Sequence, residues 1–211
     1  MKHPELEKLC EVGTNLYDRG YAFGSTGNLS VRINDEVWIT PTGRSLKGLT
    51  TDELACINLK GAQHNAQRPS KEYPFHLAVY RKRKDARALV HLHSTYSVAL
   101  SCLESLDAEE PLPPITPYYL MRVAPLAVLP YLRPGSSELA EAVGQAAEFH
   151  DCLLLRNHGL IALGADLNEA VDRAEELEET ARLSFLLRNQ ALRRLTREEI
   201  EELATIFPRR R

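Results

Sequence analysis

The segment Ala88-Leu89-Val90-His91-Leu92-His93-Ser94 decides how the chain is organised. Its first five residues are almost entirely apolar and follow charged residues, which is typical of a buried strand. Because alternate side chains of a strand share a face, His91 and His93 would lie on one side with their Cα atoms roughly 7 Å apart. Two imidazoles so placed can share one metal ion, although a His-x-His pair on a strand is more often incidental.

A third histidine strengthens the metal hypothesis. His158 lies in Asn157-His158-Gly159, at a predicted reversal between strands over 152–156 and 160–163. A turn can present a polar ring without burying it, and the alternative is a histidine that only contacts water. Three histidines match a catalytic zinc site with an open position, whereas a structural zinc site would need a fourth protein ligand.

The elements on either side of this strand predict the fold class. Hydrophobic residues recur at helical spacing at both ends of the chain, and the middle is mostly strands. We therefore expect an α/β fold, with one sheet covered by helices in three layers. The expected helices cover residues 6–20, 73–82 and 137–149, a long helix capped by Asp166, and a last helix from Thr196; the expected strands are 29–33, 37–40, 55–59, 88–92, 152–156 and 160–163.

Composition limits the function classes. A chain of 211 residues with 44% hydrophobic residues fits one domain over 1–211. The net charge of -3, from 26 basic and 29 acidic residues, gives no attraction to nucleic acid or to an anionic membrane. No apolar run approaches a membrane span and no secretory leader is evident, so a cytoplasmic location is expected. Four scattered cysteines without a CxxC pair predict reduced thiols: Cys10, Cys56, Cys102 and Cys152.

Glu72 is the candidate acid/base. It follows Arg68-Pro69-Ser70-Lys71 and precedes Pro74, in a rigid loop or the first turn of a helix. The alternative is that its carboxylate only complements the helix dipole. Ser70 and the free N–H groups of that turn could hold an anion such as phosphate.

Two further stretches could form an anion cradle, namely Ser25 to Asn28 and Thr40 to Ser45. Glycine lets backbone N–H groups converge on an oxyanion, and the neighbouring hydroxyl and amide groups add donors. Neither stretch has the Walker spacing or the dinucleotide fingerprint, so a nucleotide is not implied.

Five motifs in this order resemble the class II aldolase and adducin head family. They are Gly27-Asn28-Leu29-Ser30, Ile39-Thr40-Pro41-Thr42-Gly43, Pro69-Ser70-Lys71-Glu72, His91-Leu92-His93-Ser94 and Asn157-His158-Gly159. The resemblance extends from about the first helix to the long helix near Asn189. Within the family, which includes fuculose-phosphate aldolase and ribulose-phosphate 4-epimerase, the sequence is most similar to the 3-oxo-tetronate 4-phosphate decarboxylases, through 69–72 and 116–122.

The resemblance implies a three-layer α/β/α domain with a central, largely antiparallel mixed sheet. It also implies one Zn²⁺ or other divalent ion per subunit on the three histidines, Glu72 as the proton-transfer residue, and a homotetramer with active sites near subunit boundaries. Lys71 stands where the sugar-phosphate aldolases commonly have a second serine, which leaves its phosphate contact open. The residues expected at the substrate phosphate are Asn28, Thr42, Gly43, Ser70 and Lys71.

The implied reaction converts 3-oxo-tetronate 4-phosphate to dihydroxyacetone phosphate and CO2 through a metal-stabilised enediolate, which Glu72 protonates at C2. A sugar-phosphate aldolase acting on a ketose would reach the same intermediate and release an aldehyde. The residues that discriminate would then surround the departing group, and the candidates are Tyr118, Tyr119, Met121 and Arg122; loop packing or a subunit contact is the alternative.

A third hypothesis is a metal-free interaction module like the adducin head. The presence of all three histidines and Glu72 argues against it.

Overall fold

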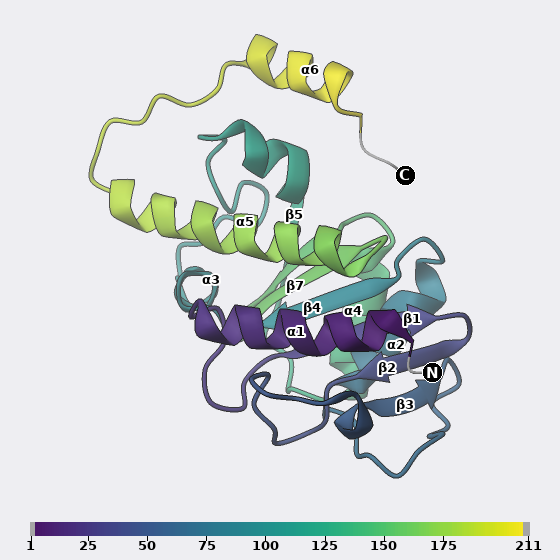
Figure 1. Ribbon diagram of the computed structural model, residues 1–211. Helices are drawn as coiled ribbons and strands as arrows, with labels where there is room; N and C mark the ends of the chain where they lie inside the picture. The colour runs from purple at the N-terminus through teal and green to yellow at the C-terminus, as the bar shows by residue number, and fades with distance from the viewer. Residues whose placement is uncertain (1–2, 209–211) are drawn as a thin grey trace.

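The chain forms one seven-stranded mixed sheet, in a computed structural model that describes residues 3–208 (Figure 1). The strand order is β3-β2-β1-β4-β7-β6-β5. Neighbouring strands are antiparallel except β5 and β6, which are parallel. The strands are β1 (Asn28–Ile33), β2 (Glu36–Ile39), β3 (Ala55–Asn58), β4 (Ala88–Leu92), β5 (Leu126–Leu129), β6 (Cys152–Leu155) and β7 (Gly159–Gly164).

Helices cover both faces of this sheet and confirm the three-layer prediction. On one face lie α1, α3 and α5, and on the other lie α2 and α4 (Figure 1). Each face has its own cluster of buried hydrophobic residues, so the sheet separates two cores. The helices are α1 (Pro4–Asp18), α2 (Tyr73–Lys82), α3 (Thr95–Ser101), α4 (Ser137–Ala147), α5 (Leu167–Leu187) and α6 (Arg197–Ile206).

Local sequence signals explain where the elements begin and turn. The Asp166 side chain accepts a hydrogen bond from Glu169 N at the start of α5, and Thr196 forms a capping box with Glu199 at α6. Asn34 adopts a positive φ of 55° in the β1–β2 hairpin, a conformation that asparagine tolerates better than most residues. The predicted boundaries of 73–82 and 88–92 match α2 and β4.

Four elements lie where the sequence predicted none. They are the 3-10 helix η1 (Thr51–Glu53), α3, β5 and the short π-helical turn η2 (Tyr119–Val123). α6 lies apart from the three layers and contacts η2 (Figure 1). Within the described residues, no helix is both long enough and apolar enough to cross a membrane.

Candidate metal centre

The structure brings the three predicted histidines together. His91 belongs to the end of β4, His93 follows that strand, and His158 lies in the turn between β6 and β7. Their ring centroids are 4.8 to 4.9 Å apart in every pairing, and the Nε2 atoms of His91 and His93 are 3.0 Å apart. Residues separated by more than sixty positions therefore present imidazole nitrogens to one point.

Close strand packing makes this convergence possible. β4 pairs with β1 on one side and with β7 on the other, with Asn28 opposite His91 and Leu160 opposite Leu92. A Cβ atom at Gly159 would lie only 2.3 Å from the carbonyl oxygen of Leu92. A larger residue would push the start of β7, and His158 with it, away from β4.

Glu72 completes the cluster from the start of α2. It occupies the N-cap position of α2, yet its side chain makes no capping hydrogen bond there. Its Oε2 lies 3.2 Å from His91 Nε2, and its Oε1 lies 3.2 Å from His158 Nε2. The carboxylate is buried and turned toward the histidines, so it does more than complement the dipole of α2.

The hydrogen bonds around the cluster fit a bound cation. His91 Nδ1 lies 2.7 Å from the Leu160 carbonyl oxygen, to which it can only donate, so a neutral His91 ring carries a lone pair at Nε2. That lone pair faces the nitrogen of His93 and the carboxylate of Glu72, which repel it unless a positive charge lies between them. Glu72 Oε1 and His158 Nδ1 are buried without a hydrogen-bond partner among the described residues. A carbonyl that fixes the tautomer of a ligand histidine is a common feature of metal sites.

Charge and burial set the protonation of the cluster. Burial raises the pKa of Glu72, but the neighbouring His91 and His158 outweigh it and hold that pKa below its usual range. Burial, followed by the charges of His91 and His158, lowers the pKa of His93 to about 3. An ionised carboxylate beside a neutral imidazole is the state that binds a divalent metal.

The expected phosphate residues lie in two groups. Thr42, Ser70 and Lys71 line a cavity of about 280 Å³ together with Arg68, which the sequence interpretation had not selected. Ser70 joins this cavity to the histidines, because its Oγ accepts a hydrogen bond from Glu72 N at 3.3 Å.

Asn28 and Gly43 complete this set. Gly43 follows Thr42 with a φ of 72°, in an exposed loop. Asn28 lies at the histidine end, where its Nδ2 donates to Glu72 Oε2 at 2.9 Å. The phosphate roles of all five residues stay predictions.

The candidate substrate residues of 118–122 lie against α5 and α6. Tyr119 is buried in a hydrophobic core, which is the packing alternative. Arg122 lies 3.4 Å from Asp172 of α5 and its guanidinium stacks over the exposed ring of Tyr118. Met121 lines a groove under α6. The structure therefore does not bring this segment to the histidines within the described chain.

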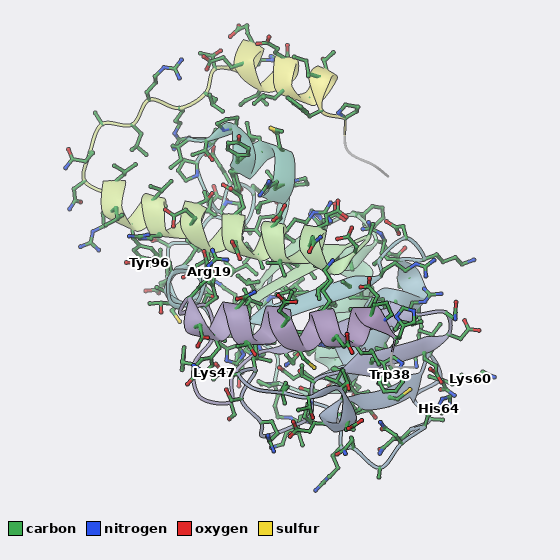
Figure 2. The ribbon with its side chains drawn as sticks, viewed as in Figure 1. Arg19, Trp38, Lys47, Lys60, His64 and Tyr96 are labelled. Atoms are coloured by element: carbon green, nitrogen blue, oxygen red, sulfur yellow. The ribbon has the colours of Figure 1, made fainter. Side chains whose placement is uncertain are left out.

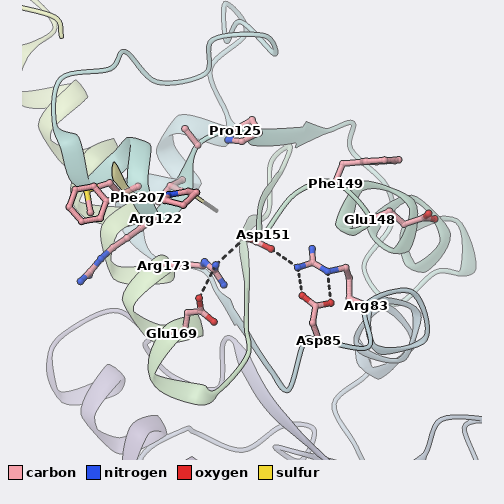
Figure 3. Close-up of a pocket in the computed structure, with 14 residues that line it drawn as sticks. Arg83, Asp85, Arg122, Pro125, Glu148, Phe149, Asp151, Glu169, Arg173 and Phe207 are labelled. Atoms are coloured by element: carbon pink, nitrogen blue, oxygen red, sulfur yellow. Dashed lines mark hydrogen bonds and ion pairs between the residues drawn. The ribbon is translucent and has the colours of Figure 1, made fainter. Parts of the chain in front are cut away.

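The large cavity beside this segment is not the metal centre. It measures about 880 Å³, and five of its charged lining residues are paired with one another (Figure 3). Asp151 bridges Arg83 and Arg173, which also pair with Asp85 and Glu169. These ion pairs join α2, α5 and the loop before β6 and need no ligand.

A second group of metal-ligating types lies at the edge of the sheet near β3, where Figure 2 labels His64. It consists of Glu36, Cys56 and His64. His64 Nδ1 pairs with Glu36 at 3.1 Å and its Nε2 lies 3.3 Å from the Asn58 amide. Both ring nitrogens of His64 therefore have partners, whereas His158 Nδ1 of the histidine cluster is buried with no partner among the described residues.

Family comparison agrees with this geometry. The family described as Class II Aldolase and Adducin N-terminal domain matches residues 7–185, and the chain belongs to it. A Haemophilus influenzae protein named 3-oxo-tetronate 4-phosphate decarboxylase is 47% identical over 200 residues, covering 94% of this chain and 95% of that protein. A Methanococcus maripaludis protein named L-fuculose phosphate aldolase is 38% identical over 185 residues, covering 88% and 97%. The crystal structure of YgbL from Klebsiella pneumoniae superposes with a TM-score of 0.92 at 44% identity, covering 95% and 97%.

Proposed function

We propose that this chain is a metal-dependent carbon-carbon lyase that decarboxylates 3-oxo-tetronate 4-phosphate to dihydroxyacetone phosphate. The observation that carries the proposal is the convergence of three imidazoles and one buried carboxylate at the end of β4. Relatives at 42–47% identity over more than nine tenths of the chain bear the decarboxylase name.

His91, His93 and His158 would hold the metal, and Zn²⁺ is an ion that catalytic sites of three imidazole ligands bind. A bound divalent ion supplies positive charge beside the substrate oxygens that become negative when the bond from C2 to the leaving carbon breaks. The end of β4 and the start of α2 bury His91 and Glu72, and His93 and His158 are half-buried, which limits the access of water to the developing charge.

Glu72 would move the proton. Because its pKa lies below the usual range, the carboxylate is ionised in the free protein and takes up a proton before delivering one to C2 from an Oε atom. Thr42, Ser70 and Lys71, which line the adjacent cavity, would hold the phosphate with hydroxyl groups and an ammonium group. The substrate would then span from that cavity to the histidines.

A sugar-phosphate aldolase is the second candidate. The relative named L-fuculose phosphate aldolase supports it, and cleavage to an aldehyde would use the same histidines and the same carboxylate. The two reactions differ only in the departing fragment.

We extend the proposal to a homotetramer. Exposed hydrophobic side chains on α5 and α6, such as Leu186 and Ile206, support self-association. Light scattering should give four times the chain mass of 23.7 kDa. A monomer at micromolar concentration would remove this part of the proposal.

Product analysis tests the reaction. The purified protein, loaded with Zn²⁺, is incubated with phosphorylated 3-oxo acids and with ketose phosphates while CO2 and aldehyde are followed. Release of CO2 without aldehyde is expected. Aldehyde release from a ketose phosphate without CO2 would select the aldolase, and no turnover with either substrate class would overturn the lyase.

A further inference from the structure

A continuous line of buried polar side chains extends from Glu72 into the core between β1 and α2. Asn28 and Ser30 alternate along β1 and so share one face of the strand. His76 and Tyr80 follow Glu72 at four and eight residues, on one face of α2. The side chains beyond Glu72 are at most 4% exposed.

Each member of this line lies within hydrogen-bonding distance of the next. The Tyr80 hydroxyl is 2.7 Å from Ser30 Oγ, which is 2.7 Å from His76 Nδ1. His76 Nε2 is 2.5 Å from Asn28 Oδ1, and Asn28 Nδ2 is 2.9 Å from Glu72 Oε2. The Tyr80 hydroxyl also lies 3.1 Å from the Ser30 carbonyl oxygen, a second acceptor for the same proton.

The carboxylate at one end fixes the direction of the hydrogen bonds. Glu72 is ionised and accepts, so Asn28 turns its NH2 group toward it and its oxygen toward His76. His76 must then carry its hydrogen on Nε2 and accept from the Ser30 hydroxyl at Nδ1. Tyr80 in turn donates toward Ser30, so every donor points along the line to the carboxylate.

His76 is the residue that selects this arrangement. Burial, and then the charge of His91, lowers the pKa of His76 to about 3, so the ring is neutral and has one donor and one acceptor. The single N–H group at Nε2 requires an oxygen from Asn28. Without that donor the Asn28 amide can rotate by half a turn and present its oxygen to Glu72, where two acceptors would repel.

We propose that His76 is a positioning residue, which holds the Glu72 carboxylate in place for proton transfer through the amide of Asn28. This inference rests on the proposed function, because it assumes that Glu72 moves the proton. It also gives a role to four buried polar groups that an ordinary core would replace with apolar side chains. Ser30 fixes the ring of His76 by its hydrogen bond to Nδ1, and Tyr80 fixes Ser30 in turn.

Kinetics of His76 variants test the proposal. In His76→Leu we expect kcat to fall about 10-fold to 100-fold, as for a small misplacement of a reacting group. We expect KM within about 3-fold and an unchanged metal content, since the three ligand histidines remain. In His76→Gln the side-chain amide can donate to Asn28 and accept from Ser30, so most of kcat should return.

A control separates positioning from stability. Val79 is fully buried on the same helix in an apolar cluster, and Val79→Ala should lower the melting temperature with kcat within about 2-fold. If Val79→Ala lowers kcat as much as His76→Leu at an equal loss of melting temperature, His76 is only structural and the proposal is overturned. Equal kcat losses in His76→Gln and His76→Leu would overturn it as well.

Two further measurements distinguish this inference from the proposed function. In a Glu72→Gln background, His76→Leu should change kcat by less than about 3-fold, because both substitutions act on one step. If the two substitutions instead lower kcat by independent factors that multiply, the inference is overturned and the role of Glu72 stays intact. Full activity of Glu72→Gln alone would overturn both. In the metal-free protein, nitrogen NMR should show His76 protonated at Nε2, and the Nδ1 tautomer would refute the arrangement.

Discussion

Replacing Gly159 with alanine should disturb the metal centre more than any surface change of equal size. The added Cβ would lie 2.3 Å from the Leu92 carbonyl oxygen, about 1 Å short of the 3.4 Å at which ordinary contact begins. β7 must therefore move about 1 Å from β4, and His158, which immediately precedes Gly159, moves with it. A misplacement of 1 Å at a reacting centre can cost about 100-fold in rate.

The assay combines kcat, zinc affinity by competition with a chelator, and the melting temperature. We expect Gly159→Ala to lose about 100-fold in kcat and to bind zinc more weakly, while the protein stays folded. Gly144→Ala on α4 is the matched control, because its Cβ would meet the Ala78 Cβ at 3.1 Å, a contact that a small shift relieves. Wild-type kcat and zinc affinity in Gly159→Ala would refute the reasoning.

Three other perturbations probe the same site. His93→Ala should abolish both metal retention and turnover, measured by metal analysis and CO2 release; an active variant would remove His93 from the site. Glu72→Gln should keep the metal and lose about 100-fold to 10,000-fold in kcat, since that is the usual value of a positioned proton transfer; a normal rate would reassign the acid/base. The pKa of His76 falls from 6.5 to about 3 on folding, so the folded protein holds this ring neutral. The free energy of unfolding is therefore unaffected by His76 above pH 6.5 and decreases as the pH falls from 6.5 toward 3. This loss amounts to at most about 5 kcal/mol. When wild type and His76→Gln are unfolded with urea at pH 7 and at pH 4.5, the free energy of unfolding should decrease less between the two pH values in the variant.

The fold could be predicted where local patterns were strong. The helical period of α2 and α5 and the apolar run of β4 are visible in the sequence, and the asparagine turns at Asn34 and Asn157 mark two reversals. β5 was missed because it has only four residues directly after Pro125 and pairs in parallel with β6 at the sheet edge. Its pairing depends on tertiary contacts that no local pattern encodes.

The residues of the candidate site could be selected from their types and their order in the chain. The buried polar residues behind Glu72 could not be selected in this way. The sequence analysis selected His91, His93 and His158 and did not select His76, whose ring is fully buried on α2. The spacing of Glu72, His76 and Tyr80 by four residues, set against Asn28 and Ser30 spaced by two on β1, was the available signal. Only the packing of α2 on β1 shows that the two patterns face one another.

The central claim is that one divalent ion binds to the three imidazoles beside Glu72. Anomalous diffraction from crystals of the zinc-loaded protein tests it most directly. The account predicts one ion per chain, with the Nε2 atoms of His91, His93 and His158 at about 2.0–2.1 Å. An ion elsewhere, or none in a preparation that still releases CO2, would contradict it.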